Sequence, residues 1–125
     1  MYLTEHKPGD HHYIRKVGQD GVVIGDEAYQ TSLILGARLL QTPWPVSDLA
    51  SLSVDKMAAL LKHQPELIIL GIGDQQQFPS TEIYAACFKQ QVGLECMTLE
   101  SACRTFNILM SENRRALLGL IFPAT

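Results

Sequence analysis

Four polar side chains recur at helical spacing within residues 98–111: Glu100, Arg104, Asn107 and Ser111. Side chains three or four residues apart lie on one face of a helix, so a carboxylate, a guanidinium, an amide and a hydroxyl would form one row. This row lies opposite the apolar stripe of the same segment and would be accessible. It is the first place in the chain where chemistry is plausible.

Together with Arg114 and Arg115, the side chains of Arg104 and Asn107 could surround a small anionic ligand, because guanidinium and amide N–H groups bind anions. The alternative is a solvated helix face in which Glu100 and Arg104 form an i, i+4 ion pair. A third interpretation is structural: the two polar side chains of the helix would hydrogen-bond a neighbouring loop. The residue types and spacing are consistent with all three.

Gly71-Ile72-Gly73 follows a short apolar run, at the place where a strand of an α/β sheet would end and a ligand crevice would open. The dinucleotide fingerprint G-x-G-x-x-G is incomplete, because position 76 is Gln and the next helix begins several residues later. We therefore expect a sharp turn that brings the backbone close to another loop. A crevice for another small molecule or anion is the alternative.

Trp44 stands between Pro43 and Pro45, which exclude it from a helix interior or a central strand. A tryptophan on a stiff loop is a good anchor for a protein partner. The commoner arrangement is a lid over the adjacent core.

The sequence carries no enzyme signature. Cys103 lies early in its helix, where the helix dipole would lower a thiol pKa, but its spacing is that of a packed core residue and no histidine is near in sequence. No nucleophile elbow and no C-x-x-C or H-x-x-x-H pair is present. His6, His11 and His12 are interpreted as solvated side chains. We expect no catalytic residue, no metal and no cofactor.

Length and composition indicate one globular domain: 125 residues, of which 46% are hydrophobic and 18% charged. We expect a flexible N-terminal arm over residues 1–12 and a single domain over residues 13–125. The net charge of −3 does not indicate the basic surface that binding of nucleic acid requires. No apolar window is long enough for a transmembrane segment, and the polar start resembles no signal or transit peptide, so we expect a soluble, cytoplasmic protein.

The central elements of the predicted fold are a helix over residues 98–111 and a strand over residues 116–122. Thr98 is placed to cap the helix, and Asn113 to end it in the left-handed conformation. The strand is almost uniformly apolar, which is typical of an inner strand covered on both faces. The stripe of the helix that would face the core comprises Leu99, Ala102, Cys103, Phe106, Leu109 and Met110.

In the rest of the chain, the sequence pattern predicts strands near the N-terminus, followed by strands and helices in alternation. Three strands are expected before any helix: a hairpin over residues 13–25 and a strand over residues 29–36. Further along, we expect a helix capped by Ser53, a strand ending at Gly71, a helix from Ser80 that stops at Gly93, and a strand over residues 94–98. Strand and helix in alternation predict an α/β domain with right-handed crossovers.

Several blocks of the chain resemble a family of small α/β domains of largely unknown function: Tyr29-x-x-Ser32, Trp44, residues 65–73, Pro79, Ala102-Cys-Arg-Thr-Phe-Asn-Ile-Leu109 and Glu112-x-Arg114-Arg115. The family includes a mitochondrial respiratory complex I assembly factor and an adipogenesis-associated protein. Two positions depart from its pattern, since Ile72 replaces the usual threonine and Phe106 the usual tyrosine. Each change removes a hydroxyl.

The resemblance implies a three-layer single α/β domain with a central mixed, mostly parallel sheet flanked by helices and an additional N-terminal antiparallel β layer. It also implies that the last strand runs antiparallel to the others. For function it implies a non-catalytic factor that binds a protein partner and assists assembly. The candidate binding residues are Trp44, Gly71, Gly73, Arg104, Asn107, Arg114 and Arg115, with a ligand-binding or enzymatic crevice near Gly71-Ile72-Gly73 as the alternative.

Overall fold

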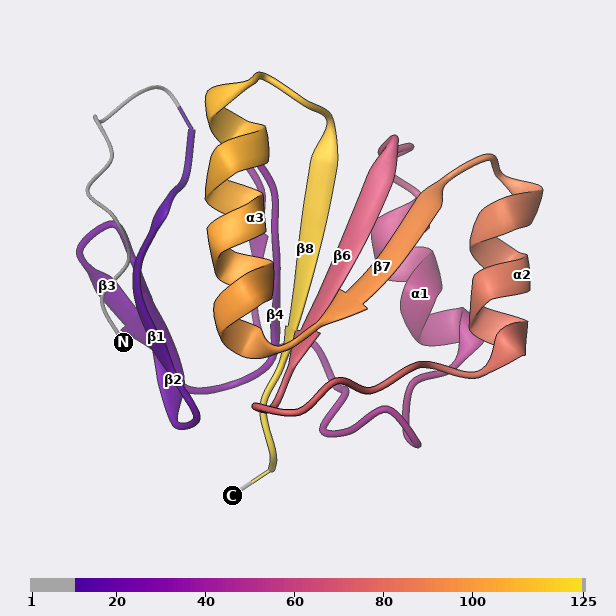
Figure 1. Ribbon diagram of the computed structural model, residues 1–125, viewed down its shortest axis with the longest axis horizontal. Helices are drawn as coiled ribbons and strands as arrows, with labels where there is room; N and C mark the ends of the chain where they lie inside the picture. The colour runs from indigo at the N-terminus through magenta and orange to yellow at the C-terminus, as the bar shows by residue number, and fades with distance from the viewer. Residues whose placement is uncertain (1–10, 125) are drawn as a thin grey trace.

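The computed structural model describes residues 11–124, so most of the predicted arm, with His6, lies outside the described residues. In the described part, an antiparallel sheet of three strands comes first, in the order β1-β2-β3. Its strands are β1 (Ile14–Gly18), β2 (Gly21–Ile24) and β3 (Glu27–Tyr29). The turn between the first two strands confirms the predicted hairpin (Figure 1).

A second, central sheet of five strands runs in the order β5-β4-β8-β6-β7. Its strands are β4 (Leu33–Leu35), β5 (Leu40–Gln41), β6 (Leu67–Ile72), β7 (Gly93–Met97) and β8 (Ala116–Ile121). β8 lies parallel to β6 and antiparallel to β4, so the sheet is mixed. The expectation that the last strand opposes the others is wrong. A helix crossover separates β7 from β8 and returns the chain in the same direction.

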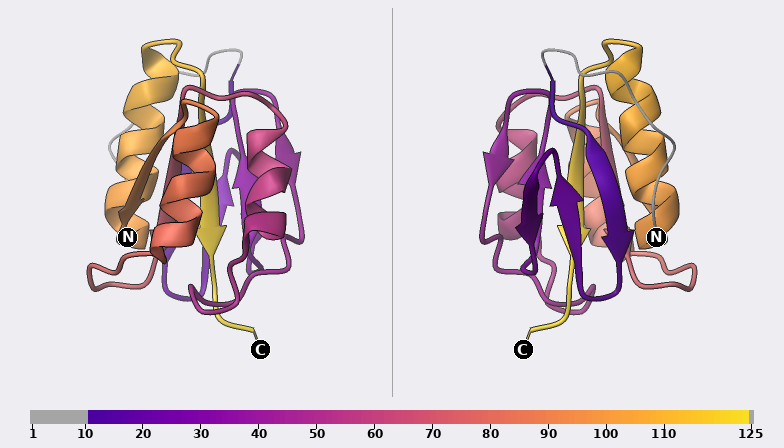
Figure 2. Two further views of the ribbon diagram at one scale, coloured as in Figure 1. Left: turned by 90° about the vertical axis from the view of Figure 1, so that its right-hand side faces the viewer. Right: turned by 90° about the vertical axis from the view of Figure 1, so that its left-hand side faces the viewer.

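Three layers result, as the family resemblance implied (Figure 2). Helix α3 (Leu99–Ser111) and the small sheet cover one face of the central sheet, and helices α1 (Val54–Leu61) and α2 (Thr81–Lys89) cover the other. Two separate apolar clusters fill the spaces between the layers. Consecutive strand residues pack into opposite clusters, as Ile68 and Ile69 do. Because both faces of β6 are buried, its sequence shows no alternation of apolar and polar residues.

The ends of α3 are formed as predicted. The Thr98 hydroxyl accepts a hydrogen bond from the Ser101 backbone N–H at 3.3 Å, which satisfies a donor that the first turn leaves free. Asn113 has φ +57° and terminates the helix in the left-handed region. All six predicted stripe residues are buried, with Phe106 fully enclosed.

The predicted strand over residues 29–36 is two strands in different sheets. β3 ends at Tyr29 and β4 begins at Leu33, so within residues 11–124 five strands precede the first helix instead of three. At the crossing, the buried hydroxyl of Ser32 donates to the carbonyl of Val46 at 2.6 Å and accepts from the N–H of Phe122 at 2.8 Å. Ser32 therefore ties the switch between sheets to the end of β8.

The stop of α2 also differs from the prediction. The helix ends at Lys89, and Gln91, with φ +60°, makes the left-handed turn. Gly93 is instead the first residue of β7. A glutamine can adopt this conformation at a cost of order 1 kcal/mol, so the glycine two residues later was a misleading signal.

Candidate functional site

The side chains of Arg104 and Asn107 contact different partners within this chain. Arg104 pairs with Glu100 at 3.1 Å, and both side chains are about half exposed, which confirms the i, i+4 ion pair of a solvated face. The Asn107 side chain reaches across to β1, where Oδ1 accepts from the N–H of Ile14 and Nδ2 donates to its carbonyl, both at 2.8 Å. Asn107 is therefore polar for a structural reason, but its partner is β1 and not the glycine loop.

Gly71 and Gly73 have different roles. Gly71 lies inside β6, where a Cβ atom would stand 2.7 Å from the Cβ of Ala102 on α3. Its placement in a turn was therefore wrong, because this glycine lets a helix approach a strand. Gly73 has φ +62° and makes the turn, and its carbonyl accepts from the N–H of Leu99 at 2.9 Å. The turn therefore brings this backbone to the first residue of α3, where the prediction had expected another loop.

A small crevice does open beside Gly73, with a volume of about 270 Å³. Asp74 and Glu100 line it, and no basic side chain does. It lies where β6 and β7 end, whereas the segment from α3 to β8, with Arg114 and Arg115, lies at the opposite end of the sheet (Figure 1). The candidates proposed around the glycine loop are therefore not brought together.

Arg114 and Arg115 join the segments that lead into β8 and β6. The carboxylate of Glu66 accepts from Arg114 Nε at 2.8 Å and from the backbone N–H of Arg115 at 3.0 Å. The guanidinium of Arg115 donates to the carbonyl of Gln64 at 2.6 Å. Hydrogen bonds from Arg114 and Arg115 lower the pKa of Glu66, and the carboxylate raises the pKa of Arg114. An open cavity of about 400 Å³ lies beside these residues.

Replacing Glu66 with glutamine should remove a pH-dependent part of the stability. The folded-state pKa of Glu66 is depressed, so its contribution is fully present above the unfolded value of about 4.5 and is lost as pH falls through the folded value. Urea unfolding between pH 7 and about pH 3 measures it. The wild type should exceed Glu66→Gln in stability at pH 7, with the gap closing at acid pH; a gap independent of pH would contradict the ion pair.

Trp44 is 2% exposed and packs in the core cluster under α1 and α2. Its indole N–H donates to the carbonyl of Lys56 at 3.3 Å. This position fits a side chain that covers the adjacent core. Almost none of the ring surface is exposed for a partner to contact.

The thiols are equally inaccessible, because Cys87, Cys96 and Cys103 are all buried and free. Burial raises the pKa of the Cys103 thiol, which opposes the effect expected from the helix dipole. Across residues 11–124, no group of three or more His, Cys, Asp or Glu is arranged to hold a metal ion.

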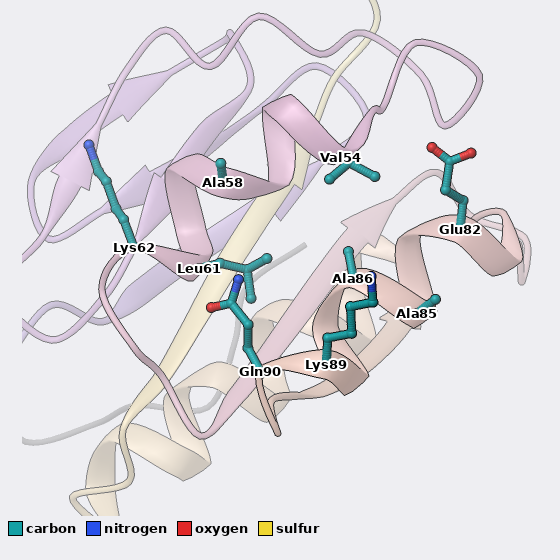
Figure 3. Close-up of a pocket in the computed structure, with 9 residues that line it drawn as sticks. All are labelled: Val54, Ala58, Leu61, Lys62, Glu82, Ala85, Ala86, Lys89 and Gln90. Carbon is teal, nitrogen blue, oxygen red and sulfur yellow. The ribbon is translucent and has the colours of Figure 1, made fainter.

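A groove lies between α1 and α2, with a volume of about 500 Å³ (Figure 3). The groove is mostly apolar. Sequence reasoning missed it, because the alanines of an exposed helix face give no signal until two such faces meet. The residues that line the groove are Val54, Ala58, Leu61, Lys62, Glu82, Ala85, Ala86, Lys89 and Gln90.

The groove exists because the facing side chains are small. Ala58 on α1 and Ala85 and Ala86 on α2 do not fill the space between the helices, and Leu61 and Gln90 point toward one another across one end (Figure 3). Ala86 and Gln90 are therefore groove positions. Such a site supplies apolar contact area and offers no nucleophile, acid or base at its floor.

Comparison with known proteins identifies relatives over nearly the whole chain. Residues 14–121 match the family described as "Protein of unknown function (DUF498/DUF598)". A "13 kDa major membrane protein" of Francisella tularensis is 28% identical over 115 residues, which are 91% of this chain and 94% of that protein. None of the helices within residues 11–124 has the length and apolar character needed to cross a membrane.

A second relative is a zebrafish (Danio rerio) protein named "NADH dehydrogenase (ubiquinone) 1 alpha subcomplex assembly factor 3". It is 31% identical over 101 residues, which are 79% of this chain and 57% of that protein, so the chain spans little more than half of it. Among solved structures, the NMR structure of a Xanthomonas campestris protein is 39% identical, with a TM-score of 0.82 over 97% of this chain and 92% of that one. The family resemblance and the fold are confirmed.

Proposed function

Because the chain belongs to the family described as "Protein of unknown function (DUF498/DUF598)", and proteins similar to it are named as assembly factors, we propose that it is a non-catalytic factor that binds a protein partner during assembly. The observation that carries the proposal is the apolar groove between α1 and α2. A mostly apolar groove between two helices is a surface of the kind that binds apolar side chains of a protein partner.

Exposed apolar side chains near α2 support the same function. Four large hydrophobic residues are exposed among residues 11–124: Val54, Phe78, Phe88 and Ile108. Val54 begins α1, while Phe88 lies on α2 and Phe78 in the loop before it. Three of the four therefore belong to α1, α2 or the loop before α2, while Ile108 belongs to α3, and exposed apolar surface is a feature of protein interaction sites.

We place this interaction in the cytoplasm. Three buried free thiols are compatible with a reducing compartment, since an oxidising one favours disulfide formation in small domains.

Quantitative in-cell cross-linking tests the proposal. Ala58→Glu with Ala85→Glu places two carboxylates in the groove, at exposed positions where folding should be unaffected. We expect at least about a tenfold loss of specific cross-linked proteins, because an unpaired charge in an apolar interface costs roughly 1–3 kcal/mol or more.

The matched control is Ser101→Glu with Ser111→Glu, which adds the same charge to the exposed face of α3. The control should keep every partner of the wild type, and both variants should keep the wild-type melting temperature. Cross-linked proteins that are identical for the wild type and the groove variant would refute the proposal.

A further inference from the structure

We infer that the occupant of the α1/α2 groove is an amphipathic helix with an acidic first turn and a basic last turn, lying antiparallel to α1 and α2. This inference rests on the proposed function and specifies the chemistry of the partner. Three features of the groove carry it: its length, its small-residue floor and the unequal charge of its two ends.

The length and floor of the groove fit a helix. α1 has 8 residues and α2 has 9, so the groove is about 12–14 Å long at 1.5 Å per residue. That length accommodates two to three turns of a partner. Its walls contribute alanines from two neighbouring helices, which leaves depth for larger side chains. A helix presenting apolar anchors at i, i+4 and i+7 matches this arrangement.

The two ends of the groove have opposite charge. α1 and α2 run in the same direction, since Val54 and Glu82 mark one end of the groove and Lys62 and Gln90 the other (Figure 3). Glu82 lies in the first turn of α2, as Asp55 does in α1. Lys89 ends α2, and Lys62 is the C-cap of α1. The acidic residues therefore belong to the first turns, at one end of the groove, and the two lysines to the last turns, at the other. In Figure 3 the Lys89 side chain points back toward Ala86 and the Lys62 side chain points away from α2.

The charges on the groove lining are available to a partner. Lys62, Lys89 and Glu82 are exposed, and the structure records no ion pair for any of them within residues 11–124. An acidic segment near the two lysines and a basic segment near Glu82 would complement this pattern.

Helix dipoles determine the direction of the occupant. Acidic residues stabilise the N-terminal turn of a helix and basic residues its C-terminal turn. An occupant that places its own acidic N-terminus beside Lys62 and Lys89 runs antiparallel to α1 and α2, so its dipole also opposes theirs. A parallel occupant would need acidic residues at its C-terminus, where they are unfavourable.

Two stapled helical peptides of about 15 residues provide the probes; the staple is needed because short helices are marginal in water. Both carry leucines spaced four and three residues apart on one face. One has glutamates in its first turn and lysines in its last, and the other has the two charges exchanged. Fluorescence anisotropy measures the affinity of the purified chain for each labelled peptide.

We expect the wild type to bind the peptide with the acidic first turn about fivefold more tightly, since exposed ion pairs each contribute modestly. The preference should shrink at high salt. Lys62→Glu with Lys89→Glu should reverse it. Arg15→Glu with Arg104→Glu makes the same change in net charge on the α3 side, at half-exposed arginines, and should leave the preference intact.

Equal binding of the two peptides, or no binding of either, would overturn the inference. That failure is distinguishable from failure of the proposed function. If the Ala58→Glu, Ala85→Glu variant still loses its cross-linked partners while the peptides show no preference, the groove binds a protein segment of another kind. If the variant loses no partner, the proposed function itself is wrong.

Discussion

Trp44→Ala should lower the free energy of unfolding by about 3–5 kcal/mol, the usual cost of truncating a large buried aromatic side chain. The ring is 2% exposed and belongs to the cluster between the central sheet and α1 and α2. It packs closely on β8, because a Cβ atom at Gly119 would stand 2.9 Å from Trp44 Cζ3. Alanine would leave a cavity that this face of the sheet cannot close.

Urea unfolding followed by circular dichroism is the suitable measurement, since Trp44 is the single tryptophan of the chain and fluorescence would be lost with it. A loss below about 1 kcal/mol would contradict the packing, because this is the range of ordinary surface substitutions. Trp44→Phe keeps most of the apolar volume and should cost clearly less. If the alanine variant does not fold, the unfolding free energy of Trp44→Phe can still be compared with that of the wild type.

This prediction also bears on function. Loss of a partner from Trp44→Ala would report unfolding, because the ring offers almost no surface for binding. The groove positions Ala58 and Ala85 are exposed and separate binding from stability.

The second large effect is expected at Gly71. A Cβ atom there would stand 2.7 Å from Ala102 Cβ and 2.9 Å from Leu120 Cδ2. Gly71→Ala should cost about 1–3 kcal/mol by overpacking, and Gly71→Val more. The Leu120 side chain can move by rotation, but Ala102 is held by the backbone of α3, so the helix itself must shift from the sheet.

A double-mutant cycle identifies this mechanism. Ala102→Gly alone should cost about 1 kcal/mol from helix propensity, yet it removes the closest atom to the new methyl group. Gly71→Ala should therefore cost less in the Ala102→Gly background than in the wild type, a coupling expected between residues in contact. Strictly additive losses in unfolding free energy would show that helix and strand are not in contact at this point.

The polar residues of the family-like blocks act in holding elements together. Asn107 joins α3 to β1 through the oxygen and the nitrogen of its side-chain amide, and Glu66 joins the approaches to β6 and β8 through Arg114 and Arg115. Side chains that satisfy backbone groups this far apart in sequence are costly to replace, because a half-buried donor or acceptor would lose its partner. They act as fold determinants, and the groove is the surface that we propose for binding.

Local patterns in the sequence determined most of the fold. The 3.6-residue periodicity of α3, the caps at Thr98 and Asn113, the hairpin before β2 and the uniform apolarity of β6 and β8 all depend on residues close together in the chain. Short-range sterics and hydrogen bonding act through the same spacing, so these features are readable without a structure. The Glu100–Arg104 pair belongs to this class.

Tertiary structure alone decided the direction of β8 relative to its neighbours, the division of residues 27–35 between two sheets and the location of the groove. Each depends on elements distant in sequence. Asn107 has the spacing of a solvated row, yet its partner Ile14 is 93 residues away. Ala58 and Ala85 look like ordinary exposed helix positions until α1 and α2 come to lie side by side on the sheet. The sequence pattern of an element shows which of its own residues are buried. The shape of the surface depends on how that element packs against others, which the pattern does not contain.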